Sequence, residues 1–286
     1  MIAAEASLNA ALAPPRWDAH LALEYEKRAS RTVLARRSHS GPLRVQRDLY
    51  PEGEGICHTI VVHPPGGIAG GDSLAVRASL GAESAALLTT PGAGKWYRTQ
   101  GNAARQTLEF DLGTGASLEW LPQETILFDG AVAEMKTSVR LGEDSTYTGW
   151  EILCFGRAAS AQKFSSGLFT QQTEIFRNDE RLWAERARVA GGDALMDSPV
   201  GLRGHSVCAT MLAAGREISN DTIAACREVA AGEGALCGVT RLPRLLIARW
   251  LGDAGEDART YFAALWGVLR PVMKRTPAIA PRIWST

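Results

Sequence analysis

Several features that assign proteins to common functional classes are missing from this chain of 286 residues. It has no run of 18 apolar residues, so no segment is predicted to span a membrane. Basic and acidic residues number 31 each, so the basic excess typical of nucleic-acid-binding proteins is absent. The five cysteines form no C-x-x-C pair, which argues against a zinc site or a disulfide framework and indicates a reducing compartment. We therefore expect a cytoplasmic protein that binds neither nucleic acid nor membrane.

Complete motifs of three enzyme classes are also missing. A dinucleotide fingerprint over residues 66–71 would need glycine at position 68, where the chain has Ile68. Residues 89–96 mimic the end of a P-loop, but Thr89 stands where the motif has glycine and Trp96 where it has Ser or Thr. His63 before a glycine run is typical of lipase oxyanion loops, yet no G-x-S-x-G elbow occurs. None of these three classes is supported.

The most unusual segment present is HPPGGIAGGD, from His63 to Asp72. Proline lacks the N–H and fixes φ, while glycine supplies conformations with positive φ that other residues avoid. Neither a helix nor a strand can propagate through such a segment. Because the apolar run 60–62 precedes it, we interpret it as a shaped loop on a β scaffold that ends in a carboxylate.

Alternating polar and apolar residues predict strands through most of the chain. We expect strands at 60–62, 107–112, 117–120, 126–128, 139–141, 147–154, 169–176, 235–239 and 245–251. Helices are predicted at about 219–231, with an N-cap in residues 219–221, and at 256–274, where apolar residues form one stripe that Pro271 would kink or end early. Glycine-rich turns between short strands favour a sandwich, a barrel or a solenoid, and no strict repeat chooses among them.

Six motifs occur in the order in which they stand in one protein family. They are residues 41–43 (GPL), residues 63–72, residues 88–93 (LTTPGA) with Lys95, Tyr97 and Arg98, residues 120–124 (WLPQE), residues 128–131 (FDGA), and residues 149–151 (GWE) with 154–157 (CFGR). Together they resemble the urease accessory proteins of the UreD type, also called UreH. The resemblance is strong from about Trp17 to Thr210 and thins beyond.

The resemblance implies a fold and a function. The fold would be a β-helix-like stack of strands with a few helices. From the sequence itself we expect one domain over residues 17–286, with the helices in its C-terminal third, after a flexible segment over 1–16. The function would be that of a non-enzymatic maturation factor, which binds apo-urease and a UreF-type accessory protein and reaches a UreG-type GTPase through the latter. Nickel would be carried in transit, with no permanently bound cofactor.

Carboxylates within or beside the motifs are the candidate nickel-transit positions. Acidic groups that line a water-filled passage lower a cation's energy without trapping it. The candidates are Asp72, Glu124, Asp129, Glu151 and Glu185, with Glu119 beside them. The alternative is that each caps a turn or pairs with an arginine such as Arg98 or Arg157.

A metal-dependent enzyme with His58, His63 and Asp72 as ligands is the competing hypothesis. On an extended strand, Cys57 and His58 point to opposite faces, whereas Cys57 and His63 lie about 20 Å apart. This spacing counts against joint chelation and favours structural roles for Cys57 and His58. A purely structural clamp without a metal passage is a third hypothesis.

Partner contacts are predicted at four further residues. Lys95, Tyr97 and Arg98 follow a Pro-Gly turn and suit either an interface or a support for the loop 63–72, since Tyr and Arg are favoured interface residues. Trp284, in the C-terminal tail, is either a docking residue or packs back on the body of the protein.

Overall fold

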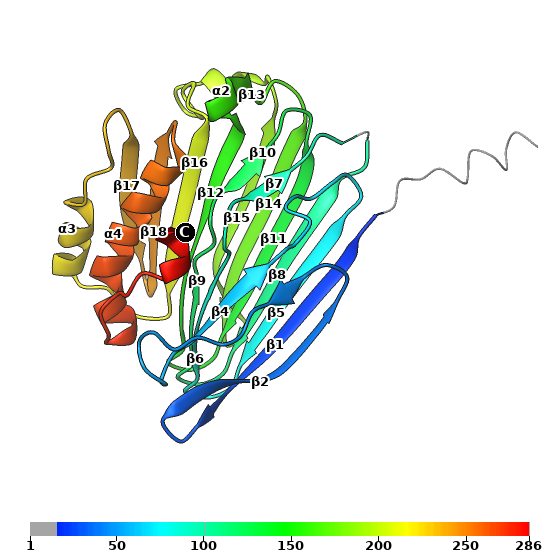
Figure 1. Cartoon of the computed structure of the whole chain (residues 1–286). Coiled ribbons are helices and arrows are strands. Elements are labelled where there is room, and N and C mark those ends of the chain that lie inside the picture. Colours follow the sequence, from blue (N-terminus) through cyan, green and yellow to red (C-terminus); the bar gives the residue numbers. More distant parts are fainter. Residues whose placement is uncertain (1–15, 100, 286) are drawn as a thin grey trace, which may run out of the picture.

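The computed structural model describes residues 16–99 and 101–285, with backbone alone at position 159. Most of this chain forms strands in two large sheets that lie face to face, and two α-helices cover the outer side of one sheet (Figure 1). The prediction of a mainly β fold is confirmed. The predicted flexible segment 1–16 lies outside the described residues except for Arg16, and the single domain over 17–286 stays a prediction.

The first sheet has seven strands, and its inner strands alternate between more buried and more exposed side chains. In spatial order they are β15 (Glu180–Ala190), β14 (Leu168–Arg177), β11 (Val132–Leu141), β8 (Ala104–Leu112), β5 (Ser73–Leu80), β1 (Asp18–Arg28) and β2 (Arg31–Ser40). The inner five pair in parallel, while the edge strands β15 and β2 pair antiparallel with their neighbours. Parallel neighbours need long connections, and here these connections run through the second sheet.

The second sheet is larger and changes from parallel to antiparallel across its width. Its main path is β17 (Leu236–Leu242), β18 (Leu245–Gly252), β16 (Val207–Ala214), β12 (Thr146–Arg157), β9 (Ser117–Trp120), β6 (Ala85–Thr89), β4 (Cys57–Val62) and β3 (Arg44–Val45). The strands β4, β6, β9 and β12 pair in parallel. All nine strands predicted from the sequence are present, with ends shifted by up to seven residues, the largest shift being the start of β11.

From β5 onward the chain winds in coils that visit both sheets in turn. Successive coils run β5–β6–β7, β8–β9–β10 and β11–β12, and each coil stacks in register on the one before. The short strands β7 (Gly94–Trp96) and β10 (Thr125–Leu127) form a third side, where β10 pairs in parallel with both β7 and the second half of β12. The strand β13 (Gln162–Lys163) pairs antiparallel with the end of β12. This stacking is solenoid-like, as the family resemblance implied.

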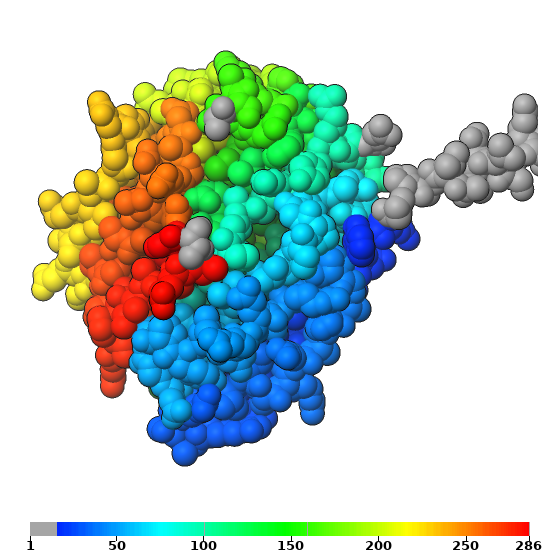
Figure 2. Space-filling view, viewed as in Figure 1, coloured from blue at the N-terminus to red at the C-terminus, as the bar shows by residue number. Residues whose placement is uncertain are grey.

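The helices lie mainly at the C-terminal end. They are α2 (Ala194–Asp197), α3 (Asn220–Arg227) and α4 (Gly255–Lys274), with 3-10 turns η1 (Ala158–Ser160) and η2 (Arg282–Ser285). The predicted helices at 219–231 and 256–274 are confirmed, and Ser219 caps α3 by accepting from the Thr222 N–H at 3.1 Å. Pro271 lies inside the last turn of α4, which continues to Lys274, so of the two expected effects of this proline the early end does not occur. Figure 2 shows the C-terminal segment lying against the body of the protein.

Two hydrophobic cores lie on opposite faces of the larger sheet. One fills the space between the sheets, and the other lies between the larger sheet and the helices α3 and α4. Cys57 belongs to the first core, whereas its neighbour His58 hydrogen-bonds with Glu52 at 2.6 Å in a polar network that includes an arginine of α4. The predicted opposite orientation of these two side chains is confirmed. Among the described residues, no helix is long and apolar enough to cross a membrane.

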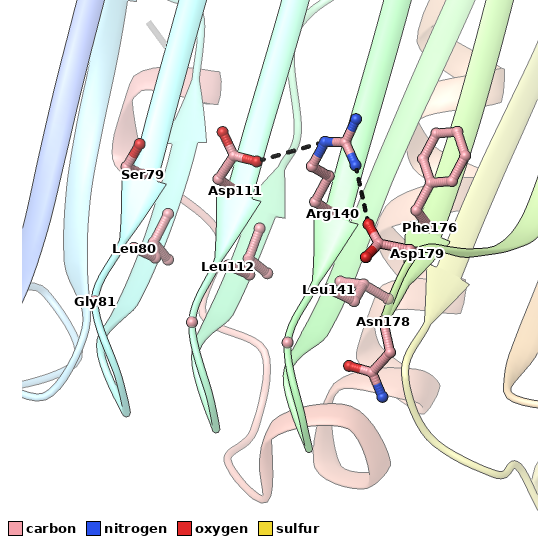
Figure 3. Close-up of a pocket in the computed structure, with 12 residues that line it drawn as sticks. Ser79, Leu80, Gly81, Asp111, Leu112, Arg140, Leu141, Phe176, Asn178 and Asp179 are labelled. Carbon is pink, nitrogen blue, oxygen red and sulfur yellow. Dashed lines mark ion pairs between the residues drawn. The ribbon is translucent and has the colours of Figure 1, made fainter.

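The turns that join the two sheets repeat in three coils. Leu80–Gly81, Leu112–Gly113 and Leu141–Gly142 stack in register, and Figure 3 shows the three leucines side by side. A Cβ atom on Gly142 would lie 2.8 Å from the Leu112 carbonyl oxygen, and one on Gly113 would lie 3.1 Å from that of Leu80. Glycine therefore lets each turn approach the turn beneath it. The sequence therefore does contain a short repeat, a Leu-Gly dipeptide at the same turn of each of these three coils.

Candidate functional site

Two of the five candidate carboxylates meet at one place. Glu151 on β12 and Glu185 on β15 both line a small cavity of ≈ 20 Å³ between the two sheets. The remaining polar lining consists of Tyr147, Thr137, Gln171, Thr173 and Thr210. A cavity of about this size holds a single water molecule. The site is therefore an oxygen-rich pocket within a predominantly apolar region.

In the part of the chain that the structure describes, the side chains that hydrogen-bond Glu151 are neutral. The Gln171 amide donates to its Oε2 at 3.0 Å, and Thr137 provides a further side-chain hydrogen bond. Burial raises the pKa of Glu151 to about 7, with the nearby Glu185 raising it further and the Thr137 hydrogen bond opposing the shift. Burial, and then the Glu151 charge, also raise the pKa of Tyr147, whose hydroxyl stays protonated. Near neutral pH, Glu151 therefore exchanges readily between its acid and its carboxylate forms.

Glu185 differs because a cation reaches it from the larger sheet. Arg249 on β18 donates to Glu185 Oε1 at 2.8 Å and to Thr210 Oγ1 at 3.1 Å. Two carboxylates, hydroxyls and an amide oxygen form a ligand set suited to a divalent cation. With one carboxylate already paired and the other protonated part of the time, such binding would be weak, as transit requires.

Asp72 serves the glycine-rich loop instead. Its Oδ2 accepts from the Ala69 N–H and its Oδ1 from the Trp17 N–H, each at 2.8 Å, so it ties the loop to the start of β1. Burial lowers the pKa of His63, although the Asp72 charge opposes the shift. Asp72 thus has the turn-capping role that was the alternative prediction.

Glu124 and Asp129 also have intramolecular partners. Glu124 accepts from Arg259 of α4 at 3.0 Å, next to the start of that helix. Asp129 Oδ1 accepts from the N–H and hydroxyl groups of Ser165 and Ser166, while its Oδ2 faces Arg98 at 3.3 Å. Burial alone would raise the pKa of Asp129, but these serine hydrogen bonds lower it to about 2. Neither carboxylate lines the Glu151–Glu185 cavity.

The predicted partner-binding residues lie in two places. Lys95 is exposed on β7, Tyr97 packs edge-on against Phe128 with ring centroids 5.1 Å apart, and the Arg98 side chain is mostly exposed. Backbone bonds from Ile68 to the Lys95 carbonyl and from Tyr97 to the Ile68 carbonyl attach this segment to the loop 63–72. The segment therefore supports the loop and also presents charged side chains to solvent.

Trp284 packs back on the larger sheet and α4. Its ring centroid lies 5.6 Å from that of Trp150 and 5.9 Å from that of Trp266, and its Nε1–H donates to Thr89 Oγ1 at 2.9 Å. The role of Trp284 in binding a partner remains a prediction.

The sequence analysis missed a buried ion network under α4. Arg270 donates to both oxygens of Glu119 and of Glu52, and Trp266 donates to Glu119 Oε1 at 2.6 Å. The Arg270 side chain is 0% exposed and both carboxylates are 4% exposed. A signal was present, because Arg270 follows Phe262 and Trp266 at helical spacing on the buried face.

The structure does not bring together His58, His63 and Asp72, which the competing enzyme hypothesis requires as metal ligands. Among residues 16–99 and 101–285, no group of three or more His, Cys, Asp or Glu side chains is arranged to hold a metal ion. His58 is engaged with Glu52 and Asp72 with backbone N–H groups. The five cysteines are free thiols.

Comparison with known proteins identifies the family. Residues 18–285 match the family model described as UreD urease accessory protein. The chain belongs to this family. It is 50% identical to the urease accessory protein UreD of Dechloromonas aromatica (strain RCB) over 275 residues, which cover 95% of this chain and 96% of that protein. It is 51% identical to UreD of Azoarcus sp. (strain BH72) over 96% of both chains, and 50% identical to UreD of Pseudomonas aeruginosa over 95% and 96%. This UreD-family chain is therefore a urease accessory protein, with a role in urease maturation.

Proposed function

We propose that this chain is a non-catalytic, cytoplasmic scaffold for nickel insertion into urease. It binds apo-urease and a UreF-type accessory protein, and a UreG-type GTPase joins through the latter. Nickel is the cargo and passes weak oxygen ligands on its way, with no permanently bound cofactor. Family membership supports the maturation role, and the adjacent Glu151 and Glu185 support the passage of a cation.

The Glu151–Glu185 cavity is the observation that carries the transit proposal. Glu151 is half-buried and its hydrogen-bond donors among the described residues are neutral, which makes a carboxylate costly there, and a structural role would be served better by an apolar side chain. The raised pKa of Glu151 lets the group accept a cation in place of a proton near neutral pH. Asp72, Glu124 and Asp129 stay candidate positions on the route, but each already has partners of its own.

Nickel loading of urease tests this proposal. The full chain would be co-expressed with UreF-type and UreG-type partners and the urease subunits, and nickel per purified urease would be measured by mass spectrometry. We expect nickel-poor urease without the chain. Glu151→Gln and Glu185→Gln should each lower nickel content several-fold, because glutamine keeps the shape but removes the charge.

A matched control separates transit from assembly. Glu180→Gln alters an exposed carboxylate at the start of β15 and should leave nickel content unchanged. Pull-down of the chain with its partners should be equal for all variants. Full nickel content in the Glu151→Gln and Glu185→Gln variants would reject these two residues as transit positions and leave a structural clamp. Full loading without the chain would reject the maturation role itself.

A further inference from the structure

The polar groups around the Glu151–Glu185 cavity belong to two rows of residues that face each other across the gap between the sheets. On the larger sheet, the strand register places Glu151 beside Thr210 of β16, and Thr210 beside Arg249 of β18. The facing row on the first sheet consists, from the inside outward, of Thr137, Thr173 and Glu185. The first sheet ends at β15 and the larger sheet one strand beyond β18, so both rows lead to the open edges of their sheets.

Arg249 lies across the outer end of the two rows. Its guanidinium donates to Glu185 Oε1 at 2.8 Å and to Thr210 Oγ1 at 3.1 Å, and it therefore bridges the two sheets. Glu185 and Thr210 line the cavity, whereas Arg249 does not. The guanidinium thus covers the outer side of the cavity and occupies a carboxylate oxygen to which an entering cation would bind.

The Arg249 side chain has room to move away from Glu185. It is 50% exposed, and the Glu185 side chain is 21% exposed. The next position of the row is Gly238 on the edge strand β17, where a Cβ atom would meet no other part of the described chain within 4 Å. Because an ion pair this exposed contributes little to stability, release of the guanidinium into solvent costs little.

The charge of a cation decides whether it can replace the guanidinium. A monovalent metal ion brings no more charge to Glu185 than Arg249 does, so it gains nothing by the exchange. A divalent ion brings twice the charge, and the attraction grows in proportion. We infer that the cavity opens at this edge and that Arg249 is a displaceable counter-ion, which lets divalent cations enter and excludes monovalent ones. This inference rests on the proposed function, because it takes the cavity to be the transit site.

Nickel binding to the full chain, labelled with ¹⁵N, tests this inference. Nickel chloride is the probe, and the side-chain amide signals of Gln171, which donates to Glu151, are assigned by their loss in Gln171→Leu. Bound Ni²⁺ is paramagnetic and should broaden these signals. Arg249→Met should lower the nickel concentration for half of the broadening about fivefold, because the competing ion pair is gone. Arg249→Lys keeps the charge and should stay within about twofold of wild type.

A comparison of sodium with choline, at equal ionic strength, tests the exclusion of monovalent ions. Choline is too large for a cavity of ≈ 20 Å³. Nickel should bind to wild type equally in the two salts, whereas sodium should weaken nickel binding to Arg249→Met. Arg188→Met removes an arginine from an exposed position of β15 and is the matched control, which should behave as wild type in both respects.

Three results would each overturn the inference: equal nickel affinity of wild type and Arg249→Met, an equal gain in Arg188→Met, or unbroadened Gln171 signals in both wild type and Arg249→Met. Nickel loading of urease decides the proposed function separately. Tighter binding to Arg249→Met together with full loading by Glu151→Gln would reject transit through the cavity and leave the Arg249 exchange standing. Reduced loading by Glu151→Gln together with equal affinities would retain transit and reject Arg249 as the counter-ion.

Discussion

The two faces of the larger sheet hold their carboxylates in opposite ways. Under α4, Arg270 binds both oxygens of Glu52 and of Glu119, and the network excludes solvent. Between the sheets, the half-buried Glu151 accepts from the neutral Gln171 amide, and Arg249 binds its neighbour Glu185. Position in the same sheet therefore does not decide whether a carboxylate is fully paired.

The two clusters therefore differ in how readily their carboxylates could bind a further cation. Glu119 already accepts from Trp266 and from Arg270, and a cation that approached it would have to displace the guanidinium. Glu151 would exchange only a proton. The first cluster fixes α4 on the sheet, whereas the proposed function requires the second to respond to a cation.

Of the variants that test this comparison, Arg270→Met should change the free energy of unfolding most. It leaves two buried carboxylates without their cation, and we expect a loss of about 3–5 kcal/mol in the free energy of unfolding. Urea unfolding of the full chain measures it. Adding Glu52→Gln and Glu119→Gln to the same variant should recover part of the loss, because the unpaired charges are then gone.

Arg259→Met is the control for that change. Its ion pair with Glu124 is partly exposed, with side-chain exposures of 21% and 15%, so the cost should stay near 1 kcal/mol or below. An equal cost for Arg259 and Arg270 would mean that the network under α4 has no special structural role.

The pH dependence of stability sharpens the comparison at Glu151. Its folded pKa of about 7 lies above its ordinary value, so the folded state binds more protons. The contribution of Glu151 to stability is therefore full below about pH 4.5 and declines as the pH rises through about 7. Between about pH 4.5 and 8, wild-type protein should lose about 1–3 kcal/mol relative to Glu151→Gln. Urea unfolding at a series of pH values measures the difference, and a difference independent of pH would contradict the raised pKa.

Local patterns predicted much of the fold. The alternation in 107–112 and the apolar stripe in 256–274 gave a strand and a helix where the structure has β8 and α4. The stacking of coils was available only from the family resemblance, because it depends on contacts between residues far apart in sequence. Leu80–Gly81 and its two repeats were short enough to pass unnoticed among 29 glycines.

The candidate site was predicted less well, for a physical reason. Sequence position cannot tell which carboxylates have partners. Glu151 and Glu185 meet because β12 and β15 lie in facing sheets, whereas Asp129 meets two serines that follow it by more than 30 residues. Arg270 was missed because arginine is mostly exposed in proteins, although its spacing placed it on the buried face of α4.

Trp284→Phe tests whether the C-terminal tail stabilises the face of the larger sheet that α4 covers, where the buried polar groups have partners. Phenylalanine keeps much of the aromatic contact with Trp150 and Trp266 but removes the hydrogen bond to Thr89 Oγ1. A single neutral hydrogen bond contributes about 1 kcal/mol, so we expect a loss of that size in the free energy of unfolding. The companion variant Thr89→Val should cost more, because Thr89 also donates to the Leu121 carbonyl at 2.6 Å. If Trp284→Phe leaves stability unchanged while weakening the pull-down of a urease or UreF-type partner, Trp284 serves the interface that its position in the tail first suggested.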